Sequence, residues 1–296
     1  MNSKLLHIAP FLAILVILPA LGFIYILGEK FKKEILVTNE RELKVDLEAG
    51  FGNIRIGKGS ADRLFTVDID ADLKKDASEY IDYSNRDETG YLSINTTDAI
   101  IEKRDKKKHS LHISGFEDNN WLMRFTDAVP ISFDIELGMG KGEIDLTGLQ
   151  VKDLNLSTGA SSVLLRFDEK NKTTIDNITI ETGLSKFKAY GLSNANFDNL
   201  KFEGGVGSYL LDFSGKLQRE VDVDIQIGLG SIILIIPDEI GAKVYYEKSW
   251  VASIDLPKYY EEKEENTYFS KNYYNAKGRL NFHIEAGLGN VTIKND

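Results

Sequence analysis

Two ten-residue stretches of this sequence are nearly identical, although they lie almost the whole length of the chain apart: LEAGFGNIRI at 47–56 and IEAGLGNVTI at 284–293. The same pattern of alternating apolar residues around Gly-x-Gly or Gly-x-Ser recurs between them. The paired small residues of the copies are Gly50 and Gly52, Gly140 and Gly142, Gly159 and Ser161, Gly183 and Ser185, Gly205 and Gly207, Gly228 and Gly230, and Gly287 and Gly289.

The pattern around each pair predicts strands. Apolar residues alternate with other residues on both sides of the glycines, and a period of two is typical of a β-strand. Glycine inside such a pattern marks a bulge, a tight bend or a close backbone approach. From Gly140 to Gly228 the copies are about 22 residues apart. We therefore predict an all-β fold, a β-solenoid-like stack in which each unit is strand, glycine corner, strand and loop.

Stacking gives the repetition a physical reason. One unit alone can neither pair its own backbone nor cover its apolar face, whereas stacked units do both. The ends of the stack expose unpaired edges and need covers. We expect covering strands at 63–73 and 90–100, and an aromatic-rich insertion at 241–280.

The first part of the chain predicts a membrane anchor. From Leu5 to Gly28 there is no Lys, Arg, Asp or Glu, and a membrane helix needs roughly 20 apolar residues. The alternative is a cleaved signal peptide, for which Ala20 and Gly22 would suit the cleavage site. The apolar run continues to Leu27, beyond a usual signal sequence, so we expect an uncleaved, single-pass anchor.

These features divide the chain into three parts. We assign 1–34 to the anchor with its basic flank, 35–134 to the N-terminal β part, and 135–296 to the repeat region with its closing strand unit. The lysines just after the anchor favour a cytoplasmic β domain. The short N-terminus and the signal-like pattern favour export, and we lean toward an extracytoplasmic β domain.

Composition excludes several classes of function. The chain has 36 Lys and Arg against 46 Asp and Glu, a net charge of −10. Nucleic-acid binding needs cationic groups to neutralise phosphates, so we expect no nucleic-acid partner. The chain has no cysteine, which excludes thiol nucleophiles, cysteine zinc sites and disulfides.

Two clusters contain residue types that bind metals. Acidic residues occupy calcium-loop positions in VDIDADLKKDASE, but Leu73 stands where the loop needs glycine, so we interpret them as the wet face of a strand. The cluster comprises Asp68, Asp70, Asp72, Asp76 and Glu79. His109 and His112 follow the basic run KRDKKKH, which favours a solvated loop over a metal pair. We predict no cofactor, no metal and no catalytic residue.

The segment 245–274 is rich in aromatic residues. Tyrosine and tryptophan suit partner and sugar surfaces because a flat apolar body carries a polar tip. The candidate partner surface comprises Tyr246, Trp250, Tyr259, Tyr260 and Tyr273. The alternative, which we favour, is that these side chains cap the open end of the solenoid.

The run VPISFDIELGMGKGEIDLTGL at 129–149, the later Gly-x-Gly/Ser turns and the closing GRLNFHIEAGLGNVTIKND together resemble the bacterial toastrack domain. This module occurs in adhesin-like proteins and in cell-wall-active antibiotic response proteins. The resemblance covers roughly residues 40–296. It implies a stack of β-turns attached to the membrane, with a role in envelope stress signalling or in presenting a surface. It supplies no catalytic residues.

We therefore predict a non-enzymatic, membrane-anchored scaffold or sensor module of a bacterial cell envelope, linked to the stress response. Its expected partners are the membrane, and membrane signalling proteins or cell-wall components. The alternative is a surface adhesin or a module that binds cell-wall glycans. A third reading, a glycan-active β-solenoid enzyme, would require a cleft with clustered carboxylates.

Overall fold

The computed structural model describes residues 30–71, 73–99, 119–247 and 251–295. The long strands are β2 (Glu42–Lys58), β7 (Ile131–Asp145), β8 (Val151–Arg166), β9 (Ile175–Tyr190), β10 (Phe197–Asp212), β11 (Glu220–Ile235) and β16 (Arg279–Lys294). The shorter strands are β1 (Lys30–Leu36), β3 (Arg63–Asp70), β4 (Ile81–Arg86), β5 (Thr89–Asn95), β6 (Asn120–Phe125), β12 (Gly241–Glu247), β13 (Ser253–Asp255), β14 (Glu261–Glu264) and β15 (Thr267–Phe269). Two 3-10 turns, η1 (Ala77–Tyr80) and η2 (Leu192–Ala195), complete the elements.

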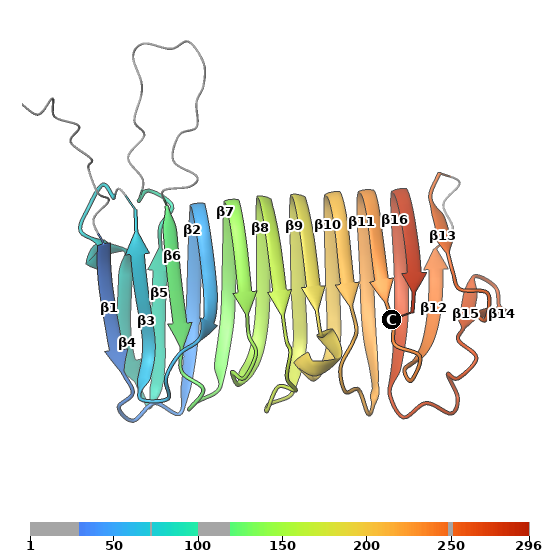
Figure 1. Ribbon diagram of the computed structural model, residues 1–296, viewed down its shortest axis with the longest axis horizontal. Coiled ribbons are helices and arrows are strands. Elements are labelled where there is room, and N and C mark those ends of the chain that lie inside the picture. The colour runs from blue at the N-terminus through green and yellow to red at the C-terminus, as the bar shows by residue number, and fades with distance from the viewer. Residues whose placement is uncertain (1–29, 72, 100–118, 248–250, 296) are drawn as a thin grey trace, which may run out of the picture.

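The long strands stand side by side and form the body of the molecule (Figure 1). They pair in parallel, in the order β2, β7, β8, β9, β10, β11 and β16. Each runs through its glycine pair without a break and turns over there. The unit is therefore one long bent strand and a loop, rather than the two separate strands that we expected. The predicted all-β, β-solenoid-like stack is otherwise what the structure has.

The bend folds the sheet into two layers. The N-terminal halves of the long strands form the first layer, and the C-terminal halves form the second layer. At one end of the stack, the first half of β2 pairs with β5 and its second half pairs with β6. At the other end, β16 pairs with β12 in the first layer and with β13 in the second.

The core lies between the two layers. Side chains alternate inward and outward along each long strand, and every inward position continues through the stack because the strands are in register. One buried column comprises Leu47, Ile135, Leu156, Ile180, Phe202, Ile225, Ile284 and Tyr246. Each apolar side chain buried in this way contributes about 1.5–3 kcal/mol.

The register corrects one predicted corner. Gly140 pairs with Gly52 and with Ser161, so the corner pair of β7 is Gly138 and Gly140. Gly142 pairs with Ile54 and lies at an inward position. A Cβ on Gly142 would lie 2.7 Å from Cδ1 of Leu137, whose side chain fills the space. GMGKG offers two overlapping Gly-x-Gly pairs, and the pattern alone does not distinguish them.

Glycine is required at the corners by close contact between backbones. A Cβ on the first glycine of a unit would lie 2.5–3.0 Å from the carbonyl oxygen of the preceding unit's first glycine, from Gly138 against Gly50 to Gly287 against Gly228. At the second corner position, Gly140 also has a φ of +137°, in a region that side chains rarely adopt. The remaining corner pairs stand in register with these, with Ser161 and Ser185 at the second position in β8 and β9.

The extra strands cover both ends of the stack. β5 and β4 extend the first layer beyond β2, while β6, β3 and β1 extend the second. At the other end, β12, β15 and β14 extend the first layer, within the predicted insertion 241–280. The predicted boundary at 134/135 falls inside β7. The edge strand β14 has the sequence EEKE and is fully exposed, which discourages pairing with another sheet.

The predicted anchor lies outside the described residues. Within the part of the chain that the structure describes, no helix has the length and apolar character needed to cross a membrane.

Glu40 ties the start of β2 to the N-terminal cover. The residue is only 6% exposed. Its carboxylate accepts hydrogen bonds from the backbone N–H of Thr38 at 2.6 Å, the side-chain amide of Asn85 at 2.9 Å and the hydroxyl of Tyr83 at 2.5 Å. Burial by itself would raise the pKa of Glu40, but hydrogen bonds from Tyr83 and Thr38 outweigh it and lower the pKa to about 2.

The corner contacts give a first prediction. We expect Gly140→Val to reduce the free energy of unfolding by more than about 3 kcal/mol, because backbone strain adds to a collision with the Gly52 carbonyl. Gly183→Val and Gly205→Val, where close approach acts without a left-handed φ, should cost about 1–3 kcal/mol. The measurement is denaturant unfolding followed by circular dichroism.

Gly57→Val is the matched control for these variants. Gly57 also lies in a long strand, but a Cβ there would meet nothing within 4 Å. We expect a change within about 0.5 kcal/mol. Equal stability of the Gly57 and Gly140 variants would contradict the account of the corner.

The Glu40 contacts give a prediction about pH. The pKa of Glu40 is lower in the folded chain than its ordinary value of 4.5, so ionised Glu40 stabilises the fold above about pH 4.5 and this stabilisation disappears as pH falls toward 2. At neutral pH, ionised Glu40 contributes about 3 kcal/mol to the free energy of unfolding.

The measurement is unfolding of the wild type and of Glu40→Gln between pH 7 and pH 3. The wild type should be the more stable at pH 7, and the gap should narrow as the solution becomes acidic. Glu169→Gln, at an exposed loop residue, is the control. A gap between wild type and Glu40→Gln that is the same at all pH values would refute the role of Glu40.

Candidate binding surfaces

A shallow trough lies on the outer side of the second layer. Its volume is about 1120 Å³, and it crosses β2, β7, β8 and β9 before ending near the η2 turn. Cationic residues predominate in its lining, although the whole chain is acidic. They are Arg55, Lys141, Arg166, Lys186 and Lys188, against the acidic residues Glu143, Asp168 and Asp212.

The stack itself positions these cations. Lys141 and Lys186 occupy the same outward row, with Ser162 between them, and Lys188 stands in the next row. Arg166 Nε lies 3.8 Å from Asp168 Oδ1. Within the described residues, none of the three lysines lies within 4.0 Å of a carboxylate. The trough therefore offers free ammonium groups beside serine hydroxyls and the Tyr190 ring, a set that suits anionic, hydroxyl-rich ligands.

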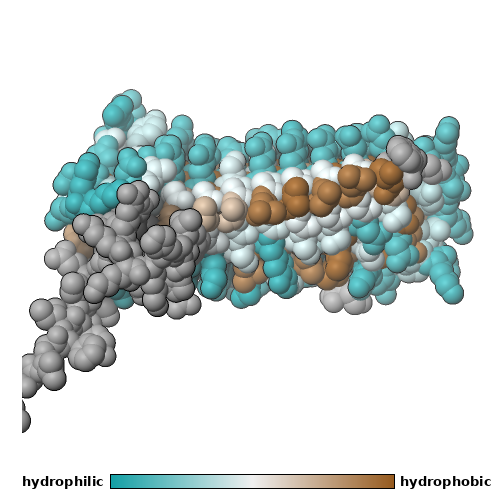
Figure 2. Space-filling model, turned by 90° about the horizontal axis from the view of Figure 1, so that it is seen from above, coloured by the Kyte–Doolittle hydropathy of each residue, from teal (hydrophilic) through white to brown (hydrophobic). Residues whose placement is uncertain are grey.

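A ridge of apolar side chains runs along the corner of the stack. It is made by the residue between the two small residues of each corner pair, and these residues stand in register from β2 to β16. We call it the corner ridge; its members are Phe51, Met139, Ala160, Leu184, Val206, Leu229 and Leu288. Figure 2 looks down on it and shows a line of hydrophobic residues along the molecule. The sequence reasoning missed this surface, although the middle residue of every corner is apolar.

The predicted aromatic surface is divided by the fold. Tyr246 is 2% exposed and ends the buried column described above, and Tyr273 is buried, with its hydroxyl donating to Asn281 Oδ1 at 2.7 Å. Tyr259 is exposed and its ring lies 5.3 Å from that of half-buried Tyr260. Burial raises the pKa of the Tyr260 hydroxyl. Trp250 lies outside the described residues.

The aromatic residues therefore do not form one surface in the described part of the chain. Phe269 and Tyr273 pack edge to face against each other with ring centroids 5.2 Å apart, over the end of the first layer. Exposed Tyr274 stacks on Phe269 and receives the Lys263 ammonium 4.8 Å above its ring. This arrangement fits an end cap.

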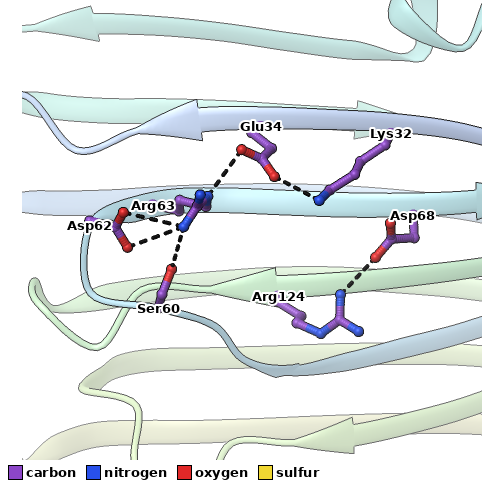
Figure 3. Close-up of polar contacts among 7 residues, drawn as sticks. All are labelled: Lys32, Glu34, Ser60, Asp62, Arg63, Asp68 and Arg124. Atoms are coloured by element: carbon purple, nitrogen blue, oxygen red, sulfur yellow. Dashed lines mark hydrogen bonds and ion pairs between the residues drawn. The ribbon is translucent and has the colours of Figure 1, made fainter.

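The acidic cluster that resembled a calcium loop is dispersed. Asp68 lies in β3 and accepts from Arg124 at 2.7 Å, beside the ion pairs of Arg63 and Lys32 with Glu34 (Figure 3). Asp76 instead caps η1 by accepting from the Ser78 amide at 2.8 Å. Asp72, His109 and His112 lie outside the described residues. Within the described ranges, no group of three or more His, Asp or Glu side chains could hold a metal ion.

His283 lies in a short polar row on the first layer. Its Nδ1 is 3.1 Å from Asp224 Oδ1, and its ring centroid is 5.3 Å from that of Tyr245. All three side chains are exposed. The row joins three neighbouring strands and is open to solvent, so we assign it no chemistry.

Comparisons with known proteins place the fold in a family. The model of the family described as the N-terminal domain of toast_rack, DUF2154, matches residues 28–190, more than half of the chain. No curated protein matches the chain.

Three solved structures are similar to this chain. A putative cell adhesion protein from Clostridium sporogenes is 21% identical, with a TM-score of 0.44 over 90% of this chain and 99% of that one. Putative adhesins from Bacteroides fragilis and Parabacteroides merdae are 14% and 10% identical, with TM-scores of 0.39 and 0.38; each similarity covers 90% of this chain and 97% of the other. On the match to its family model, the chain belongs to the toast-rack family.

Proposed function

We propose that this protein is a non-enzymatic scaffold or sensor module of a bacterial cell envelope, anchored by its N-terminal segment and linked to the stress response. The observation that carries the proposal is the geometry of the described surface. In-register stacking arranges outward side chains in long rows, and the trough on the second layer is open and has no metal-binding cluster among the described residues. Such a surface suits binding of extended partners. Membership of the toast-rack family supports the same reading.

The trough favours a second, related candidate, a module that binds cell-wall glycans or acts as a surface adhesin. Among the described residues, three lysines without carboxylate partners face the trough, which also carries hydroxyl and aromatic groups. Anionic wall polymers, which carry phosphate or carboxylate groups along a hydroxyl-rich chain, match this set. A sensor of the envelope would use such a contact to detect the wall.

Binding to wall material tests the trough. We expect the β domain to bind isolated cell wall saturably, and Lys141→Gln/Lys186→Gln/Lys188→Gln to weaken binding about ten-fold, since each exposed ionic contact contributes about 0.5 kcal/mol or a little less. Added salt should weaken wild-type binding more than binding of the variant. The measurement is co-sedimentation with purified wall.

Lys170→Gln/Lys258→Gln/Lys277→Gln is the control, because it removes the same charge from exposed residues outside the trough. If both triple variants lose wall binding equally, binding depends only on net charge, and the trough is not the binding site. Turnover of any wall-derived substrate by the purified domain would overturn the non-enzymatic reading.

We also predict that the β domain lies on the extracytoplasmic side of the membrane. With a C-terminal tag, we expect added protease to digest the β domain in intact cells whose wall has been removed. Digestion only after the membrane is permeabilised would place the β domain in the cytoplasm. That result would exclude wall binding and leave the scaffold for membrane signalling proteins.

A further inference from the structure

The corner ridge is a continuous apolar strip that runs along the stack. Met139, Val206 and Leu229 are 43–46% exposed, Leu288 is 51% exposed and Leu184 is 64% exposed. Neighbouring strands are about 4.8 Å apart, so the seven members span roughly 30 Å. Contiguous exposed apolar groups of this kind mark interaction sites in soluble domains.

A groove of about 700 Å³ follows the ridge on the side of the first layer. The first corner glycines of β7 to β11 and of β16 form its floor, because the absence of side chains there leaves a channel. The far wall is a row of outward side chains in register: Glu136, Ser157, Glu181, Glu203, Gln226 and Glu285. Figure 2 shows this hydrophilic row running beside the hydrophobic line.

The row leaves negative charge available along the groove. Glu203 pairs with Lys201 at 2.5 Å. Glu136, Glu181 and Glu285 are exposed and have no ion pair within 4.0 Å among the described residues. Asp134 and Asp224 stand one row further out on the same layer. An occupant must therefore present apolar groups to the ridge and positive charge to the groove.

This requirement distinguishes between the kinds of partner that could bind here. A stable dimer buries about 800 Å² on each partner, which is more than a strip one side chain wide provides. An anionic lipid surface is repelled by the carboxylates of the groove. A basic amphipathic helix satisfies both sides of the site. Its pitch of about 5.4 Å is close to the spacing of the strands, so one apolar residue per turn can follow the ridge.

We propose that the corner ridge and the glutamate groove form a docking site for a basic amphipathic helix of a partner protein, lying lengthwise along the stack. This proposal specifies the kind of partner that the proposed scaffold would bind, and it rests on that proposed function. The lysine trough on the second layer takes no part in it, so the two sites are tested by separate variants.

The test uses the full chain in detergent micelles and a fluorescent synthetic helix of about 18 residues, built from leucine and lysine with the leucines along one side. Fluorescence anisotropy at two salt concentrations measures binding. We expect saturable binding that Leu184→Ser/Val206→Ser/Leu229→Ser weakens about ten-fold or more, because the apolar contact is lost. Glu136→Gln/Glu181→Gln/Glu285→Gln should weaken binding similarly and also reduce its salt dependence.

Three controls make the result specific. A peptide of the same composition with scrambled order removes the apolar side but keeps the charge. Glu169→Gln/Glu239→Gln/Asp198→Asn removes the same charge away from the groove. The trough variant Lys141→Gln/Lys186→Gln/Lys188→Gln should bind the helix as the wild type does. Circular dichroism melting of every variant, and the single variant Leu184→Ser, separate loss of binding from loss of fold.

Equal binding of the ordered and scrambled peptides, or of the ridge variant and the wild type, would overturn the proposal. So would a ridge-dependent dimer in sedimentation, which would make a second copy the occupant. Ridge-dependent flotation of the domain lacking residues 1–29 with neutral lipid vesicles would instead make the membrane surface the occupant. Loss of wall binding in the trough variant with normal helix binding would leave this site standing, because the two surfaces fail independently.

Discussion

The contact on which the rest of the structure depends is the approach of one backbone to the next at the corner. The first corner glycine of each unit lies against the carbonyl oxygen of the unit before it, from Gly138 on Gly50 to Gly287 on Gly228. A side chain at these positions would push the strands apart. The corner therefore holds all the long strands in one register, and a slip by one residue would both place a Cβ in this contact and turn the core side chains outward.

With the strands held in this register, side chains of complementary size pack against each other across the core. Gly142 is small because Leu137 from the same strand fills its place, and the ring of Tyr209 takes the space in front of Gly204 in the same way. Protein interiors are closely packed, so a small residue on one layer requires a large one opposite. This complementarity lets the repeat vary in sequence while its backbone stays regular.

The same register determines what the surface can do. Because each outward position becomes a row, the described surface carries linear features: a ridge, a glutamate row and a lysine-lined trough. Rows of this kind favour extended partners over small molecules held in a closed pocket. The ridge separates a negative side from the trough with its lysines, so the two long surfaces differ in the charge of the partners that they suit.

The sequence by itself determined the fold class, because alternation and the Gly-x-Gly/Ser corners are local, periodic signals that are repeated along the chain. Only the tertiary structure decided which glycines of GMGKG form the corner, since overlapping pairs differ only in their partners on β2 and β8. Likewise, Tyr246 is buried because β12 pairs with β16, a contact that no local pattern encodes. The corner ridge follows the same logic. Its residues lie singly, far apart in the chain, and they become one surface only when stacking brings the corners together.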